Sequence, residues 1–178
     1  CIRDSLDIVP PTTDVRIRDI HNPRWSYRLA KICGENWLAN STLPWLIVRY
    51  FNVYGPNSKP GHFVRDQINR IRGGRFAIIG ANETRSFCHV EDAASATITC
   101  GDLVQGEIIN IGNDEEILIS DASALISAAL GHADPSWEIL PGNAGSVKRR
   151  KPDISRLREL MPGYHPLPFW RGILTCLD

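Results

Sequence analysis

Tyr27 and Lys31 are the two residues of this sequence whose types and spacing point most directly to acid–base chemistry. They stand four residues apart, so a helix would place them on one face with about 5–6 Å between their Cβ atoms. A phenol ordinarily keeps its proton up to a pH of about 10, and a neighbouring ammonium favours the phenolate. The pair therefore predicts a tyrosine that exchanges a proton with a substrate, although an ordinary amphipathic helix can show the same spacing.

The elements that must position this pair are a helix and the strand that follows it. Apolar side chains recur at helical spacing over residues 25–39, which predicts an amphipathic helix ending at Asn40. The apolar run 46–48 predicts a short strand buried on both faces. Ligands of α/β proteins collect at the carboxyl ends of such strands, so Asn52 is a candidate ligand contact, with a plain strand exit as the alternative.

The rest of the chain is expected to alternate helices and strands. Residues 1–24 contain three prolines and are expected to form a loop with at most one short strand. Arg85 and His89 would share one face of a single strand, and Glu91 or Asp92 would cap the next helix. Further helices are expected over 62–72, 90–102, 120–131, 152–160 and 170–177, and further strands over 76–79, 84–90, 107–111, 117–119 and 137–140.

The composition is that of a globular domain without a strong overall charge. Twenty basic residues balance twenty acidic ones, so no global field attracts nucleic acid or a membrane surface. No apolar run approaches the ~20 residues that a membrane span needs. The five cysteines form no CxxC motif or Cys/His cluster, which predicts reduced thiols, no metal site and a cytoplasmic protein. Because the chain starts at Cys1 without Met, we expect a piece of a longer protein or a processed product.

The chain contains, in order, the segments SYRLAK, LIVRYFNVYGP, TRSFCHVEDAASA, EIINIGN and KRRKPDISRLREL. Together these segments resemble the extended short-chain dehydrogenase/reductases, in particular the nucleotide-sugar epimerases and dehydratases. The resemblance covers nearly all of residues 22–175. It implies an α/β fold: the C-terminal part of a Rossmann-like domain with a small mixed α/β substrate-binding subdomain.

The resemblance implies roles for three residues at the cofactor side of a site. Tyr27 would be the catalytic acid/base that trades a proton with a sugar hydroxyl. Lys31 would hold the nicotinamide ribose and lower the pKa of Tyr27. Tyr50 would lie near the nicotinamide. The implied cofactor is NAD or NADP, which takes the hydride in this chemistry.

The resemblance also implies a set of substrate contacts. Arg85 and one of Arg149 and Arg150, with Arg150 favoured, would pair with phosphate, because arginine offers phosphate a planar fork of donors. The alternatives are that Arg85 is a strand-surface residue and that the two later arginines belong to a solvated run. The other implied contacts are Asn52 with the pyrophosphate and the backbone groups of Ala77 and Ile79 with the nucleotide base.

The sequence departs from the family by lacking its N-terminal part. No GxGxxG or GxxGxxG turn occurs, although such a turn holds the dinucleotide pyrophosphate. The family's catalytic Ser or Thr would fall at or before Cys1, and Ser5, the nearest hydroxyl, is not expected to replace it. Residues 1–56 are expected to end the Rossmann-like domain, and 57–178 to form mainly the substrate-binding subdomain, with 86–112 returning to the Rossmann-like sheet.

The expected function is the C-terminal, substrate-binding part of an NAD(P)-dependent nucleotide-sugar epimerase or dehydratase. By itself the chain is expected to be inactive and to bind NAD weakly. Its expected partners are a nucleotide sugar and a second copy of itself. A non-enzymatic nucleotide-sugar binding module and a dimerisation partner are the alternatives. The base, the sugar, the choice between NAD and NADP, and the choice among epimerase, dehydratase and decarboxylase stay open.

Overall fold

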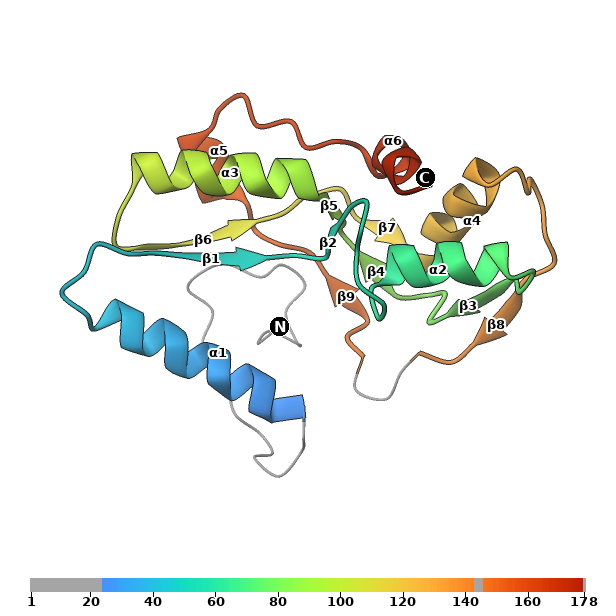
Figure 1. Cartoon of the computed structure of the whole chain (residues 1–178), viewed down its shortest axis with the longest axis horizontal. Helices are drawn as coiled ribbons and strands as arrows, with labels where there is room; N and C mark the ends of the chain where they lie inside the picture. The colour runs from blue at the N-terminus through green and yellow to red at the C-terminus, as the bar shows by residue number, and fades with distance from the viewer. Residues whose placement is uncertain (1–23, 143–145, 178) are drawn as a thin grey trace.

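The computed structural model describes residues 24–142 and 146–177, so the loop expected over residues 1–24 lies, apart from Arg24, outside the described residues. Helices and strands alternate along the chain (Figure 1). The helices are α1 (Arg24–Ala39), α2 (Phe63–Arg72), α3 (Val90–Leu103), α4 (Ile119–Ala129), α5 (Ser155–Leu160) and α6 (Phe169–Gly172), followed by the 3₁₀ turn η1 (Ile173–Cys176). The strands are β1 (Leu46–Tyr50), β2 (Val53–Tyr54), β3 (Ala77–Ile79), β4 (Thr84–Arg85), β5 (Cys88–His89), β6 (Glu107–Ile111), β7 (Ile117–Leu118), β8 (Glu138–Leu140) and β9 (Arg149–Arg150).

The longest strands, β1 and β6, form a parallel pair at the left of Figure 1. Tyr50 lies opposite Ile111, so both strands end at the same edge. Helices α3 and α5 lie on one side of the pair and α1 on the other (Figure 1). The core beneath α3 and α5 includes Cys88, Ala96, Cys100, Ile109, Ile111 and Leu157.

A second core lies at the right of Figure 1, where α2, α4 and α6 surround three small sheets. Strands β3 and β8 pair in parallel, as do β2 and β5, and β4 lies between antiparallel β7 and parallel β9. Aromatic rings fill this core, with the ring centroids of Phe87 and Phe169 4.7 Å apart. Its largest members are Tyr54, Ile71, Phe87, Ile126, Phe169 and Ile173.

Helix α1 is tied to β1 by one ion pair. Arg49 of β1 donates from Nε to Glu35 Oε1 at 2.7 Å, and its Nη2 forms a second contact with the other carboxylate oxygen. Both side chains are largely sheltered, with 16% and 21% of their surface exposed. This two-point geometry fixes an arginine relative to a carboxylate better than one contact would. It therefore sets how α1, which carries Tyr27, lies against the strand.

Strand β1 is less buried than its apolar run predicts. Of the three residues 46–48, Ile47 is buried, whereas Leu46 and Val48 are half-buried. The reason is that β1 pairs with β6 and with no other strand among the described residues. The expectation of a strand buried on both faces is wrong for the chain as described.

The expectation of a single strand over residues 84–90 is also wrong. The segment breaks at buried Ser86 and Phe87 into β4 and β5, which belong to different sheets, and Val90 already begins α3. Arg85 and His89 therefore do not share one strand face. The helix cap is His89, whose Nδ1 accepts from the amide of Glu91 at 3.4 Å, instead of Glu91 or Asp92.

Two later helices also differ from expectation at their ends. Asp153 lies before α5, where its carboxylate accepts from the Ser155 amide at 2.9 Å, so the helix begins at Ser155 instead of at residue 152. The expected helix over 170–177 is a short α-helix that tightens into η1. Such tightening is common where a helix ends.

Gly172 in α6 is predicted to be required for the stability of the fold, because Tyr54 leaves no room for a methyl group at this position. A Cβ at this position would lie 2.0 Å from Tyr54 Oη and 3.0 Å from Cζ, and Tyr54 is only 2% exposed. We expect Gly172→Ala to lower the free energy of unfolding by about 1–3 kcal/mol in urea denaturation. Gly101→Ala, in α3 with open space around the glycine, should be neutral or stabilising.

Tyr54→Phe supplies a further check on this packing. The buried Tyr54 hydroxyl has no hydrogen-bond partner among the described residues, so its removal costs little. In the Tyr54→Phe background, Gly172→Ala should be less destabilising than in the native chain. Equal effects in both backgrounds would show that the contact is not the cause.

Arg149 of β9 is predicted to stabilise the fold in a pH-dependent way through Glu116. Hydrogen bonds from Arg149 lower the pKa of Glu116 to about 2. Because an unfolded glutamate titrates near pH ~4.3, this stabilisation is complete above that pH and is lost as the pH falls towards 2. Arg149→Gln should therefore lower the free energy of unfolding at pH 7 by on the order of 1 kcal/mol, seen as a lower melting temperature, and the difference should shrink below pH ~4.

Arg75→Gln is the matched control for this pH series. Arg75 pairs with Glu138 at 3.4 Å, but both side chains are more than half exposed. Such a pair contributes little, so this variant should melt close to the native chain at every pH. A difference between Arg149→Gln and the native chain that stays constant or widens in acid would contradict the assignment.

Candidate functional site

The candidate site lies at the carboxyl end of β1, where Asn52 joins the strand to the rest of the chain. Asn52 has a positive φ of 42°, which is uncommon for a residue other than glycine. Its side-chain amide donates to the Ser86 carbonyl at 2.9 Å, and its carbonyl accepts from the Cys88 amide at 3.3 Å. These two bonds hold the strand exit against the segment between β4 and β5, beside Arg85.

Arg85 and Arg150 occupy neighbouring strands in this region. Strands β4 and β9 pair in parallel with Arg85 opposite Arg150, and residues opposite each other in a parallel pair face the same side of the sheet. The Ser86 amide donates to the Arg150 carbonyl at 3.2 Å, which fixes this register. Burial and then the charge of Arg150 lower the pKa of Arg85. Two guanidinium groups of like charge therefore lie close together in a sheltered place.

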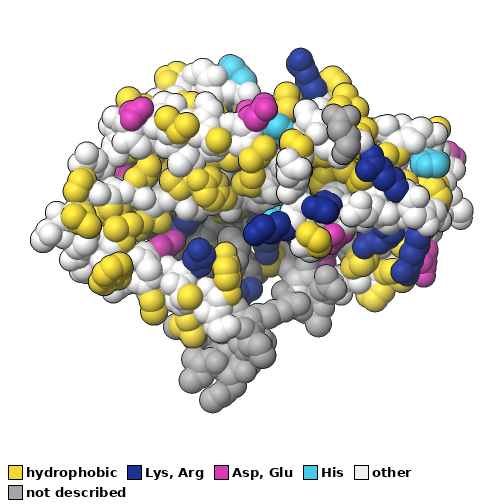
Figure 2. All heavy atoms as spheres, in the orientation of Figure 1, with side chains coloured by type: hydrophobic (Ala, Val, Ile, Leu, Met, Phe, Trp, Pro, Cys, Tyr) yellow, Lys and Arg dark blue, Asp and Glu magenta, His cyan; other side chains and the backbone are white. Residues whose placement is uncertain are grey.

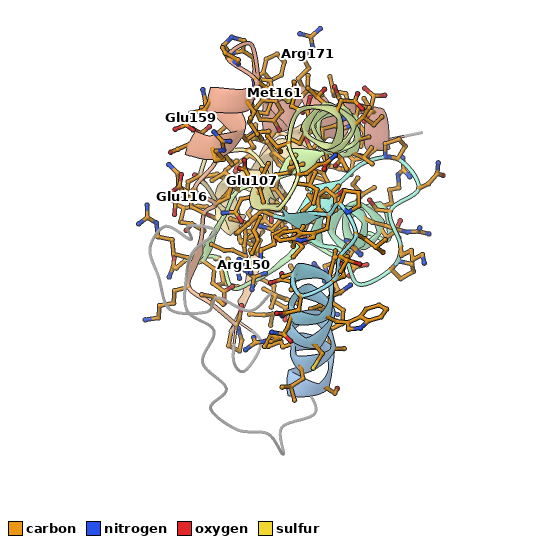
Figure 3. The ribbon with its side chains drawn as sticks, turned by 90° about the vertical axis from the view of Figure 1, so that its left-hand side faces the viewer. Glu107, Glu116, Arg150, Glu159, Met161 and Arg171 are labelled. Carbon is orange, nitrogen blue, oxygen red and sulfur yellow. The ribbon has the colours of Figure 1, made fainter. Side chains whose placement is uncertain are left out.

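Arg149 lies on the opposite face of the same strand. It is opposite Thr84 in the register, and both side chains bond to Glu116: Arg149 Nε and Nη2 at 2.7 and 2.8 Å, and the Thr84 hydroxyl at 2.5 Å. Figure 3 labels Glu116 at the outer edge of the molecule and Arg150 farther in, towards α1. The geometry therefore separates the two arginines and groups Arg150, which the family resemblance favoured, with Arg85.

Arg85 is held in place by groups of the protein itself. Its guanidinium pairs with Glu83, donates to the Ser146 hydroxyl at 3.0 Å and donates to the Thr84 carbonyl at 2.6 Å. Ser146 in turn donates to Glu83 at 2.6 Å. Only 12% of the Arg85 side chain is exposed. Glu83 and Ser146 thus position the arginine and partly neutralise its charge.

Tyr27 and Lys31 share one exposed face of α1. Tyr27 is 63% exposed, and Lys31 Nζ lies 5.5 Å from the centre of its ring. Helix α1 runs back beneath β1, so that its first turns lie towards the end where β1 stops (Figure 1). The Tyr27 hydroxyl is therefore not consumed by core packing.

Tyr50 lies on β1, whereas Ala77 and Ile79, the two expected backbone contacts, both lie on β3. The Tyr50 hydroxyl is 2.8 Å from Thr97 Oγ1 of α3, and the side chain is 49% exposed at the end of β1. The carbonyl of Ala77 accepts from the Gln67 amide at 3.1 Å inside the core. This carbonyl already has a donor within the protein, whereas Ile79, at the end of β3, is only half-buried.

Glu83 and Ser146 are site residues that the sequence reasoning missed. Glu83 stands two residues before Arg85, a spacing that places both on one side of an extended segment, so the pair could have been noticed. Ser146 is 61 positions away from Arg85, and no local pattern connects them. Only the folded chain brings that hydroxyl to the site.

Residues 24–142 and 146–177 contain no group of three or more His, Cys, Asp or Glu side chains that could hold a metal ion. Among the helices of these residues, none combines the length and the apolar character needed to cross a bilayer.

Sequence comparison identifies relatives for most of the chain. A family model described as "NAD dependent epimerase/dehydratase family" matches residues 4–112. UDP-N-acetyl-alpha-D-glucosaminuronate decarboxylase of Bacillus cytotoxicus is 35% identical over 165 residues, covering 83% of this chain and 50% of that protein. UDP-glucuronic acid decarboxylase 3 of Arabidopsis thaliana is 31% identical over 126 residues, covering 67% of this chain and 36% of that protein.

Structure comparison leads to the same group of proteins. UDP-glucuronic acid 4-epimerase from Bacillus cereus, solved in complex with UDP-glucuronic acid and NAD, matches with a TM-score of 0.76 and 27% identity over 85% of this chain and 51% of that chain. This similarity shows that the fold is α/β and Rossmann-like. The chain spans half or less of the length of these curated relatives. On this evidence, the chain belongs to the NAD-dependent epimerase/dehydratase family.

Proposed function

We propose that this chain supplies the substrate-binding part of an NAD(P)-dependent enzyme that modifies the sugar of a nucleotide sugar. The observation that carries the proposal is the placement of Arg85 and Arg150 on one face of paired strands, next to Asn52 at the carboxyl end of β1. Binding sites of open α/β sheets lie at this end of the strands.

The two arginines suit a diphosphate. Their charges repel each other in a sheltered environment, and a doubly charged anion between them would remove that repulsion. Each guanidinium presents several parallel N–H groups, which match phosphate oxygens in geometry as well as charge. Asn52 would donate from the same side to the pyrophosphate.

Glu83 has a defined place in this proposal. In the structure described here it is the carboxylate that balances Arg85. A bound diphosphate would compete with it for the guanidinium, while Ser146 and the Thr84 carbonyl would still orient the arginine. Glu83 would thus keep the arginine ordered when no substrate is present.

The cofactor side of the site would consist of Tyr27 and Lys31 on α1. Tyr50 would reach it only across the end of β1, because its hydroxyl bonds to Thr97 of α3 on the other side of the strand pair. Lys31 is exposed, so its ammonium would be free to donate to a ribose hydroxyl, and the half-exposed ring of Tyr50 would offer an edge to the nicotinamide. When bound, NAD(P) supplies the acceptor and donor of hydride.

The chain's own contribution to the chemistry would be a proton transfer. Tyr27 would take the proton of a sugar hydroxyl as that carbon is oxidised and return it at the end of the cycle. Lys31, one helical turn away, would stabilise the charge that develops on the Tyr27 oxygen.

The relatives favour a UDP-linked uronic acid as the substrate. The two curated relatives are UDP-N-acetyl-alpha-D-glucosaminuronate decarboxylase and UDP-glucuronic acid decarboxylase 3, and the solved relative holds UDP-glucuronic acid. We also propose that the site forms in the reducing cytoplasm, since the four cysteines among the described residues are free thiols.

The proposal also includes the assembly and the domain organisation. The protein would act as a homodimer. Residues 1–56 would end a Rossmann-like domain, and residues 57–178 would form mainly a substrate-binding subdomain, with 86–112 returning to the Rossmann-like sheet.

Arg85→Gln and Arg150→Gln are predicted to weaken binding of UDP-glucuronic acid to this chain. Each removes charge-assisted hydrogen bonds to the diphosphate, which should raise Kd about thirtyfold, or roughly 2 kcal/mol, in isothermal titration calorimetry. Arg149→Gln is the control, because it removes the same charge from the same strand but on the face that carries Glu116. Equal weakening by all three variants would indicate only a general charge effect.

Tyr27→Phe is predicted to abolish turnover without abolishing binding. In a polypeptide that also contains the cofactor-binding half, loss of the hydroxyl should lower kcat by about 10²–10⁴-fold and leave the Kd for UDP-glucuronic acid nearly unchanged. Trp37→Phe, at an exposed position of the same helix, should leave both values unchanged. Undiminished turnover by Tyr27→Phe would remove the enzymatic assignment of this residue, and turnover absent from the native protein would favour a binding module.

A further inference from the structure

A cavity of about 600 Å³ lies between α2, the loop after β2 and the C-terminal turn η1. Its lining shares no residue with the group formed by Asn52, Arg85 and Arg150. The volume is in the range of sites that hold small organic molecules, which is about 300–1,000 Å³. A ligand in this cavity would therefore be separate from a nucleotide sugar at the strand ends.

One wall of the cavity is a polar and basic stripe along α2. Arg65, Asn69 and Arg72 line it, and their spacing of four and three residues places them on one side of the helix. The two arginines are two helical turns apart, about 10 Å along the axis. Among the described residues that line the cavity there is no aspartate or glutamate. Figure 2 shows Lys and Arg side chains gathered on this face of the molecule, over α2 and the loop before it.

Both arginines are already directed by the neighbouring walls. Arg65 Nη1 donates to the carbonyl of Ser58 in the loop, and Arg72 Nη2 donates to the carbonyl of Leu177 after η1. A guanidinium has five N–H groups, so each retains donors for another acceptor. Because the side chains are held in advance, less conformational entropy is lost when a ligand binds.

The remaining walls are mixed in character. Pro56, which is exposed, supplies apolar surface from the loop after β2, and the nearly fully buried Val64 and Ile68 lie at the base of the cavity. Thr175 and Cys176 face them from η1. The cavity therefore offers donors for anionic groups and an apolar surface for a carbon skeleton.

We propose that this cavity binds a small phosphorylated organic molecule, with its phosphate on Arg65 and Arg72 and its carbon skeleton against Pro56. Guanidinium forks match the geometry of phosphate oxygens, and the absence of carboxylates from the lining leaves their positive charge unopposed within the cavity.

Cys176 provides a reporter inside the cavity, and Cys33, on the exposed surface of α1, provides an internal reference. Burial raises the pKa of the Cys176 thiol, so alkylation with iodoacetamide is best followed at a pH of about 9 by mass spectrometry of peptides. Glucose 1-phosphate should slow alkylation of Cys176 about tenfold at ten times its Kd and leave Cys33 unchanged. No selective protection up to about 10 mM would overturn the proposal.

Charge-matched variants separate this cavity from the proposed nucleotide-sugar site. Arg65→Gln and Arg72→Gln should each reduce the protection of Cys176 at least fivefold, whereas Arg75→Gln, on the exposed pair with Glu138, should not. Arg85→Gln should leave the protection intact even where it abolishes binding of UDP-glucuronic acid. Three results would overturn the assignment. They are protection that survives in Arg65→Gln and Arg72→Gln, protection that is lost in Arg85→Gln, and equal protection by citrate.

Discussion

The parallel pairing of β4 with β9 is the constraint on which the candidate site depends. The register places Arg85 opposite Arg150 and Thr84 opposite Arg149. Because neighbouring side chains of a strand point to opposite faces, the two pairs lie on opposite faces of the sheet. A shift of one residue would put Arg149 beside Arg85 and turn Arg150 to the face of Glu116. The bond from the Ser86 amide to the Arg150 carbonyl, and the pair between Arg149 and Glu116, both hold the observed register.

The surrounding fold serves to bring distant segments to this short sheet. Asn52 arrives from the end of β1, and the turn before β4 supplies Glu83. Ser146 comes from the segment that leads into β9. The two cores meet where β2 pairs with β5, directly after Asn52, with Val53 opposite Cys88. The site therefore depends on the order of the strands more than on any single helix.

Much of the fold could be predicted from hydrophobic spacing. The helix predicted over 25–39 and the strand predicted over 107–111 match α1 and β6 closely. Their apolar patterns are clear, and Asn40 and Gly112 mark where they end. The strand over 84–90 could not be predicted correctly, because the break at Ser86 comes from pairing with two different sheets. Local pattern contains no information about which distant strand a residue will meet.

The candidate site could be predicted in part. Residue type and the family resemblance identified Arg85 and Asn52 as candidates, and the structure shows that they are neighbours. The resemblance already favoured Arg150 over Arg149, and the register gives a structural reason for that preference. The role of Ser146 needed the folded chain. Tyr27 and Lys31 stay predictions of the sequence, because their partners in the proposed reaction are a cofactor and a sugar.

A crystal structure of this chain with bound UDP would test the central claim most directly. The account predicts the diphosphate between Arg85 and Arg150, with guanidinium N to phosphate O distances of about 2.7–2.9 Å and Arg149 still paired with Glu116. A diphosphate bound on the Arg149 face, or bound away from both Arg85 and Arg150, would contradict it.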